Sequence, residues 1–92
     1  MLVRARFAGM VRHFTKDTEK YYELPDGACV SDLLMLIGRE YGERMPGQMW
    51  SPEEERFHPL IRAIRRGSPM ADDDEELADG DEIFIISRMA GG

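Results

Sequence analysis

The first part of the chain alternates between apolar and polar positions. Val3, Ala5 and Phe7 fall on one face of an extended segment and arginines fall on the other, which is typical of a strand with one buried face. The alternation predicts a strand over residues 2–8. A second strand is predicted over residues 20–24, because the turn-forming sequence Pro-Asp-Gly follows it directly.

Two connecting segments lack a clear period. Residues 9–18 are too long for a tight hairpin turn and carry polar side chains, so we expect a loop that a few apolar side chains partly anchor: Met10, Val11 and Phe14. Residues 43–58 contain prolines and glycine, and the sequence from Ser51 to Glu54 is typical of a capped helical turn. Trp50 and Phe57 are expected to anchor this second segment to the domain.

Between these segments lies the most regular pattern of the chain. Apolar residues recur at helical spacing and predict a helix over residues 30–41 with one buried stripe, formed by Val30, Leu33, Leu34, Ile37 and Tyr41. Gly42 stands where this helix would end. Cys29 or Ser31 is the expected N-cap, and the charge of Asp32 suits the positive end of the helix dipole.

Two further strands complete the expected architecture. Residues 60–65 and 83–86 predict them, with a short additional strand possible near Met70. Since the first and last strands flank all other elements, we expect them to be parallel neighbours at the centre of a mixed sheet of about four to five strands. One main helix would cover one face of that sheet, which gives an α+β fold.

The last strand is apolar on both faces. Ile83 and Ile85 fall on one face and Phe84 and Ile86 on the other, yet a single helix covers only one. Uncovered apolar surface on a small domain is typical of a binding site. The alternative is that residues 43–58 cover the second face.

Length and composition limit the class of protein. A chain of 92 residues is expected to form a single domain, residues 1–92, around one modest core. No apolar run approaches the roughly 20 residues that a membrane span requires, and the charged start does not resemble a secretory signal. Cys29 is the only cysteine, so an internal disulfide is impossible. We expect a cytoplasmic protein with no membrane association.

Charge is distributed unevenly. Residues 1–70 carry 11 basic and 10 acidic side chains, whereas residues 71–92 carry one arginine and eight acids, so the net charge of −6 is concentrated near the C-terminus. Nucleic acid is excluded as a partner, because phosphate binding requires clustered cations. The acidic run of residues 72–76 is either a solvated loop or a surface that steers the chain toward a basic partner protein.

The end of the sequence is the strongest indication of function. Gly91 and Gly92 follow the last strand after a short linker, and two residues without side chains can enter a slot too narrow for any others. We expect residues 87–92 to be a flexible functional segment, here called the C-terminal tail, which would span roughly 20 Å if extended. A carboxylate is inert until another enzyme activates it. His13 and His58 are isolated in the sequence, and no metal site is expected.

Taken in order, the motifs resemble those of the MoaD/ThiS family of sulfur carriers. The resemblance rests on the opening strand that ends Arg-Phe-Ala at residues 6–8, on residues 27–34 at the helix start, on Leu-Ala-Asp-Gly-Asp-Glu-Ile at residues 77–83, and on the Ala-Gly-Gly end. Length and this ending are most similar to the small subunit of molybdopterin synthase. The family implies a ubiquitin-like β-grasp fold.

The resemblance also implies a mechanism, in which the chain is a carrier and not an enzyme. An E1-like adenylating enzyme would use ATP to activate the Gly92 carboxylate, and a sulfurtransferase or other persulfide donor would convert it to a thiocarboxylate. A large synthase subunit or another acceptor enzyme would then take the sulfur. The chain itself would bind no cofactor. Position and resemblance assign partner binding to Gly91, Ala90, Met89, Arg88, Phe7, Met70, Phe84 and Ile86.

Other functions stay open at this point. The sulfur could serve thiamine, cysteine or tungsten-enzyme pathways instead of molybdopterin. A protein modifier would join Gly92 to lysine amines, and a plain β-grasp interaction module would not need the diglycine at all. Cys29 could also carry sulfur as a persulfide, although nothing nearby in the sequence marks its thiol as activated. Alternation along the first strand places Phe7 inward, which opposes its role in docking.

Overall fold

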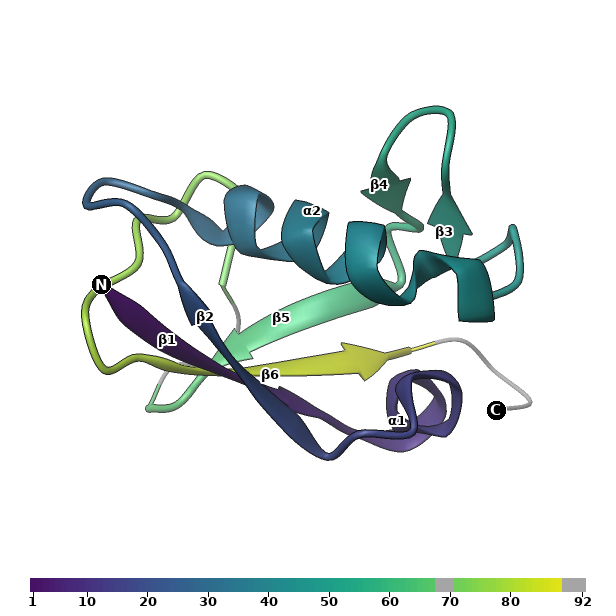
Figure 1. Cartoon of the computed structure of the whole chain (residues 1–92), viewed down its shortest axis with the longest axis horizontal. Helices are drawn as coiled ribbons and strands as arrows, with labels where there is room; N and C mark the ends of the chain where they lie inside the picture. The colour runs from purple at the N-terminus through teal and green to yellow at the C-terminus, as the bar shows by residue number, and fades with distance from the viewer. Residues whose placement is uncertain (68–70, 89–92) are drawn as a thin grey trace.

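The structure is a computed structural model that describes residues 1–67 and 71–88. Two helices and a four-stranded sheet form the body of the domain, with a short hairpin beside them (Figure 1). The elements in chain order are β1 (Leu2–Phe7), α1 (Gly9–Thr15), β2 (Glu19–Glu23), α2 (Val30–Tyr41), the 3-10 helix η1 (Gly42–Arg44), β3 (Trp50–Ser51), β4 (Arg56–Phe57), β5 (Ile61–Arg65) and β6 (Glu82–Ser87).

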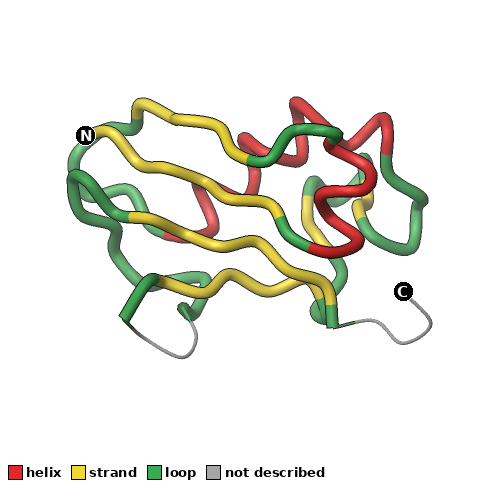
Figure 2. Tube along the Cα trace, turned by 90° about the horizontal axis from the view of Figure 1, so that it is seen from below, coloured by secondary structure: helices red, strands yellow, loops and turns green. Residues whose placement is uncertain are grey.

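The main sheet has the strand order β2-β1-β6-β5. β1 and β6 pair in parallel at its centre, with Ala5 opposite Ile83, while β2 and β5 pair antiparallel on the two sides. This confirms the mixed sheet and the central parallel pair that the sequence predicts. Helix α2 crosses one face of the sheet, here called the inner face, and the opposite face is the outer face (Figures 1 and 2).

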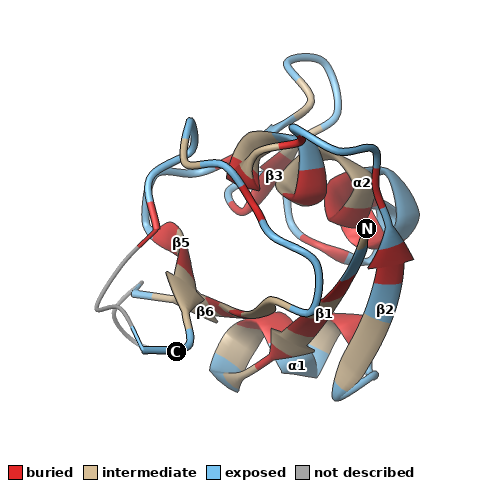
Figure 3. Cartoon of the chain, turned by 90° about the vertical axis from the view of Figure 1, so that its left-hand side faces the viewer, coloured by how far each residue is buried: buried red, intermediate tan, exposed pale blue. Residues whose placement is uncertain are grey.

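The core lies between α2 and the inner face. Val30, Leu33 and Ile37 are fully buried on the helix, and the inward residues of the central strands are buried as well (Figure 3). Leu34 is only partly buried, so the helical stripe is narrower than expected. Tyr41 packs edge-on against Phe7 at 5.3 Å between ring centroids and donates a hydrogen bond of 2.6 Å to Asp17. Burial raises the pKa of Tyr41, which keeps this donor protonated.

Helix α2 begins with a cap formed by Cys29 and Asp32. Cys29 is the N-cap in extended conformation, which confirms one of the two predicted caps. Its backbone N–H donates to the Asp32 carboxylate at 2.9 Å, and its thiol donates to the same oxygen at 3.3 Å. These hydrogen bonds lower the pKa of Asp32, the backbone bond being the larger cause.

The cap makes stability depend on pH. Because the folded state lowers the pKa of Asp32, its contribution is present above the ordinary aspartate pKa of about 3.9 and is lost as pH falls through the lower folded value. We expect Asp32→Asn to reduce the free energy of unfolding by about 1 kcal/mol at neutral pH. The gap between wild type and variant should close in acid. Urea unfolding at several pH values measures it, with the exposed Asp74→Asn as control. A gap that stays constant into acid would refute the assignment.

The segment expected to be a loop after β1 is helix α1. Val11 and the polar Thr15 are fully buried and lie four residues apart, with Phe14 packed against the core, so the segment buries one helical face. The prediction was wrong because no capping side chain marks the start of α1, and Gly9 begins it with a φ of +58°. Helix α1 lies at the end of β1 and contacts β6 (Figure 1).

The helical turn expected at Ser51–Glu54 is also wrong, because Trp50–Ser51 pairs with Arg56–Phe57 as the hairpin β3–β4. The expected contact from the Glu54 N–H to the Ser51 hydroxyl exists at 3.2 Å, but it belongs to the loop of this hairpin. The rings of Trp50 and Phe57 pack against each other across the two strands, with 4.8 Å between their centroids. Both are buried, which confirms them as the anchors of residues 43–58.

The indole of Trp50 lies directly on two glycines of the preceding helical segment. A Cβ built on Gly38 would stand 2.0 Å from the Trp50 ring, and one built on Gly42 would stand 2.4 Å from it. No side chain fits at either position without moving the indole. The two glycines therefore allow Trp50 to pack directly on the helix backbone, which holds the hairpin β3–β4 against α2.

The acidic run is partly structural. The Ser31 N–H donates to the Asp73 carbonyl at 2.8 Å, so the run covers the start of α2. Arg65 forms ion pairs with Glu75 at 2.7 Å and with Asp81 at 2.9 Å. Residues 72–74 are exposed. Instead of the short strand expected near Met70, the described residues there form a single antiparallel bridge between Ala71 and Ala63, and Met70 itself lies outside them.

Candidate docking surface beside the C-terminal tail

Strand β6 leads directly to the C-terminal tail. Ser87, expected to be the first tail residue, is the last residue of β6 and pairs with Ile61. The Arg88 N–H donates to the Leu60 carbonyl at 2.8 Å, so the chain leaves the sheet beside the start of β5. Five predicted site residues lie outside the described residues: Met70, Met89, Ala90, Gly91 and Gly92.

The outer face of the sheet presents an apolar patch on β5 and β6. Ile83 and Ile85 are fully buried on the inner face, whereas Phe84 and Ile86 are partly exposed on the outer one. Ile64 pairs with Phe84 across the two strands and shares its face. We call Ile64, Phe84 and Ile86 the outer patch. Phe84 and Ile86 were predicted from the sequence, but Ile64 was missed although it alternates with the buried Ala63 in the same way.

Residues 43–58 do not cover the outer patch. The hairpin β3–β4 lies on the same side of the sheet as α2 (Figure 1). Seen from the outer side, the four strands lie side by side, and within the described residues no helix crosses them (Figure 2). The sequence left open whether this segment covers the second apolar face of β6, and the structure decides that it does not.

Arginines surround the outer patch. The Arg6 guanidinium lies 5.7 Å from the centroid of the Phe84 ring, within range of a cation–π interaction. The Glu82 carboxylate accepts from Arg4 at 3.0 Å and from Arg66 at 2.9 Å. More arginines than acids therefore line this region, although the chain as a whole is acidic. A complementary partner surface is apolar at its centre and acidic at its rim.

Phe7 does not belong to this surface. It is 4% exposed and packs against Tyr41 on the inner face, opposite the outer patch. Its placement agrees with the alternation of β1 and not with the role that the family resemblance implied. Residues of one strand that differ by an odd number of positions point to opposite faces, so Phe7 and Arg6 cannot serve the same surface. Arg6 is the residue of the outer face at this point of β1.

The described residues contain neither a cluster of metal-ligating side chains nor a membrane-spanning helix. No group of three or more His, Cys, Asp or Glu side chains in residues 1–67 and 71–88 is placed to hold a metal ion. None of the helices formed by those residues has the length and apolar character needed to cross a membrane.

Sequence comparison finds neither a family model nor a curated protein that matches the chain. Solved structures do match over its full length. SAMP1 from Haloferax volcanii, a small archaeal modifier protein, superposes with a TM-score of 0.80 at 16% identity and covers 100% of both chains. Putative molybdopterin converting factor subunit 1 from Pyrococcus furiosus superposes with a TM-score of 0.71 at 23% identity, covering 96% of this chain and 98% of that one.

A third match comes from an assembly. The complex of subunits 1 and 2 of molybdopterin-converting factor from Helicobacter pylori contains a chain that superposes with a TM-score of 0.55 at 17% identity, covering 100% of both. These likenesses establish the ubiquitin-like β-grasp fold, which confirms the fold that the family resemblance implied.

Proposed function

We propose that the chain is a sulfur carrier of the MoaD/ThiS type, whose working group is the Gly92 carboxylate. The observation that carries the proposal is the position of Phe84 and Ile86 in the outer patch, because both lie on β6, the strand that leads into the C-terminal tail. A partner that docks on Phe84 and Ile86 is held where it can receive the residues that follow. The full-length likeness to a molybdopterin converting factor subunit supports the same conclusion.

The proposed reaction takes place on partner enzymes. An adenylating enzyme binds ATP, the Gly92 carboxylate attacks the α-phosphorus, and pyrophosphate leaves, which gives an acyl adenylate. A persulfide on a sulfur donor then attacks the carbonyl carbon and expels AMP. A second thiol of the donor cleaves the resulting S–S bond, forming a donor disulfide and leaving a thiocarboxylate on Gly92. The chain supplies no general base and binds no cofactor in this scheme.

Molybdopterin synthesis is the proposed destination of the sulfur, with a large synthase subunit as acceptor. Two matched structures are named as molybdopterin converting factor subunits, and one of them stands in a complex with subunit 2. The likeness to SAMP1, named as a modifier, favours a second candidate, in which lysine amines attack the adenylate and Gly92 becomes an isopeptide. The outer patch and the C-terminal tail would serve both functions.

Reconstitution separates these candidates. The chain is incubated with an adenylating enzyme of this class, ATP and a persulfide donor, and its intact mass is recorded. We expect an ATP-dependent increase equal to the replacement of one oxygen by sulfur. Conjugates that survive reductant would support the modifier instead. If neither product forms, and removal of Gly91 and Gly92 leaves partner binding unchanged, the chain is a plain interaction module.

Phe84→Ala tests the outer patch. Loss of a ring at the centre of an interface typically costs more than 1 kcal/mol, so we expect the KM of the adenylating enzyme for the chain to rise about tenfold. Stability should change little, because Phe84 is partly exposed. Leu2→Ala is the matched control, since Leu2 is 49% exposed at the other end of the sheet. Equal KM values for both variants would remove the outer patch from the proposal.

A further inference from the structure

The acids beside the outer patch are already bound to arginines. Glu82 accepts from Arg4 and Arg66, and only 9% of its side chain is exposed. Glu19 lies opposite Arg6 in the register of β1 and β2, but it accepts from Arg4 instead. These acids therefore neutralise Arg4 and Arg66 and leave Arg6 without a close carboxylate.

Two arginines beside the outer patch are not neutralised, and they stand on opposite sides of it. Arg6 lies over the Phe84 ring, and its nearest carboxylate oxygen, on Glu82, is 3.9 Å away. Arg62 lies opposite Ile86 on β5 and forms no ion pair with the described residues. Its Nε is buried and has no hydrogen-bond partner among them. A partly buried cation without an acid is stabilised by a carboxylate from outside.

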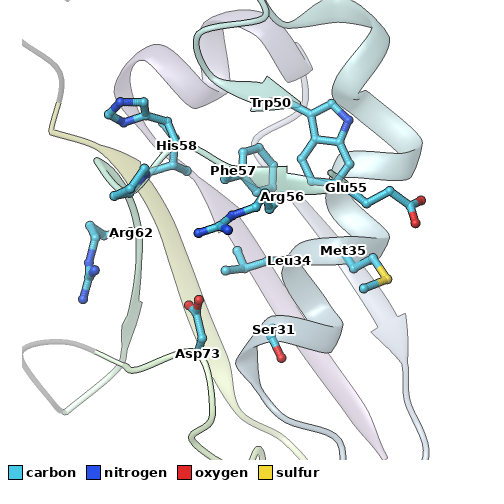
Figure 4. A pocket seen from close by; sticks show the side chains of 12 residues that line it. Ser31, Leu34, Met35, Trp50, Glu55, Arg56, Phe57, His58, Arg62 and Asp73 are labelled. Atoms are coloured by element: carbon cyan, nitrogen blue, oxygen red, sulfur yellow. The ribbon is translucent and has the colours of Figure 1, made fainter. Parts of the chain in front are cut away.

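The alternation of β5 places Arg62 on the outer face. Its neighbours Ile61 and Ala63 are buried on the inner face, so the residue between them points the other way. The close-up of the pocket beside α2 agrees, because the Arg62 guanidinium points away from Leu34 and Phe57 (Figure 4). Arg62 therefore belongs to the surface that carries the outer patch.

The occupant of this surface is a different protein and not a second copy of the chain. Two outer patches placed face to face would bring the free arginines of both copies into one interface, where like charges repel. The Arg88 N–H donates to the Leu60 carbonyl, two positions before Arg62. A protein that receives the C-terminal tail therefore passes beside this arginine.

The register of the sheet sets the distance between the two free arginines. Arg6 lies opposite Phe84 on β6, and Arg62 lies opposite Ile86, so the arginines differ by two strands and two positions. With strands about 4.8 Å apart and a rise of about 3.3 Å per residue, their Cα atoms are about 12 Å apart. In an extended segment, residues four positions apart span about 13 Å and share one face with the residue midway between them.

We propose that the outer patch selects a partner surface on which two carboxylates, about 12 Å apart, flank one large apolar side chain. The apolar side chain packs on Phe84 and Ile86, and Arg6 and Arg62 each bind one carboxylate. The two arginines thus determine which partner binds. That this partner is the adenylating enzyme rests on the proposed function, whereas the chemistry of the site does not.

An NMR titration of the free, full-length chain tests this pairing. The probe is acetyl-Glu-Thr-Leu-Thr-Glu-amide, whose glutamates flank one leucine at the expected spacing. We expect saturable shifts of the Phe84, Ile86 and Arg62 signals at millimolar peptide. The counterpart with two glutamines should bind about fivefold more weakly, because each exposed ion pair contributes a modest amount. The isomer acetyl-Thr-Glu-Leu-Glu-Thr-amide should also bind more weakly, since its carboxylates lie on the side opposite the leucine.

Variants identify the arginines that bind the carboxylates. Arg6→Met and Arg62→Met keep an unbranched stem and remove the charge, so each should lower the preference for glutamate to about twofold. Arg62→Lys keeps the charge and should retain the preference. Arg56→Met is the matched control, because Arg56 is an exposed arginine on β4, away from the outer face. The amide spectrum of each variant shows whether it is folded.

Three results would overturn the proposal: equal binding of the glutamate and glutamine peptides, the absence of saturable shifts at Phe84 and Ile86, or an unchanged preference in Arg62→Met. Neither ATP nor Gly92 takes part in the titration, so its outcome is independent of sulfur loading. In the reconstituted reaction, sulfur loading with the same KM for wild type and Arg62→Met would keep the proposed function and remove Arg62 from recognition of the adenylating enzyme.

Discussion

Gly92→Ala should slow sulfur loading of the chain about 100-fold, because a methyl group in a channel built for bare backbone displaces the reacting carbon, and displacements near 1 Å can cost this much. We expect stability to be unchanged, since residue 92 lies five positions beyond the end of β6 in the sequence. The measurement is the initial rate of mass gain in the reconstituted reaction, with urea unfolding recorded on the same samples.

The control for Gly92→Ala is Gly47→Ala, a glycine position at which an added methyl group would contact no other atom. A Cβ on Gly47 would have no atom within 4 Å, and Gly47 has no left-handed φ. Gly47→Ala should load sulfur at the wild-type rate. Loading of Gly92→Ala at that same rate would show that no narrow channel receives the C-terminal tail.

The largest expected effect on stability comes from Gly38→Ala. The new methyl group would overlap Cζ3, Cη2 and Cε3 of Trp50 at 2.0, 2.2 and 2.4 Å, so the hairpin β3–β4 must move away from α2. We expect the free energy of unfolding to fall by about 2–3 kcal/mol, as for other overpacked cores. That is a large part of the stability of a domain of 92 residues. Urea unfolding measures the loss.

The same substitution made in a Trp50→Ala chain identifies the cause of this loss of stability. With Trp50→Ala the clash is gone, and Gly38→Ala should then stabilise the chain by up to about 1 kcal/mol, the ordinary preference of a helix for alanine over glycine. A reversal of sign between the two backgrounds is expected only if the indole is the obstacle. The same loss in both backgrounds would mean that Gly38 acts through the helix itself.

The elements that the sequence predicts best are those that bury a long periodic face. The central strands β1 and β6 and the helix α2 each present several apolar residues at the period of their structure, and all three form as expected. Helix α1 has only seven residues, begins at a glycine and lacks a capping side chain. Strands β3 and β4 have two residues each, which is too short for any alternation to be visible.

The outer patch and the packing of the hairpin depend on contacts between segments that are far apart in the sequence. Such contacts are harder to predict than single elements. The packing of Trp50 needs two glycines four positions apart, Gly38 on α2 and Gly42 at the start of η1. Nothing local in the sequence marks them as a pair that contacts an aromatic residue farther along the chain. The place of Arg6 beside Phe84 follows from the register of β1 on β6. Phe7 shows the converse, because its burial on the inner face follows from the alternation of its own strand.

Fragmentation of the sulfur-loaded chain in a mass spectrometer tests the central claim most directly, because it locates the new atom. We predict that only fragments containing Gly92 gain mass, by the replacement of one oxygen with sulfur. A fragment that contains Cys29 and has gained a whole sulfur atom, with Gly92 unmodified, would contradict the account and make the thiol the carrier.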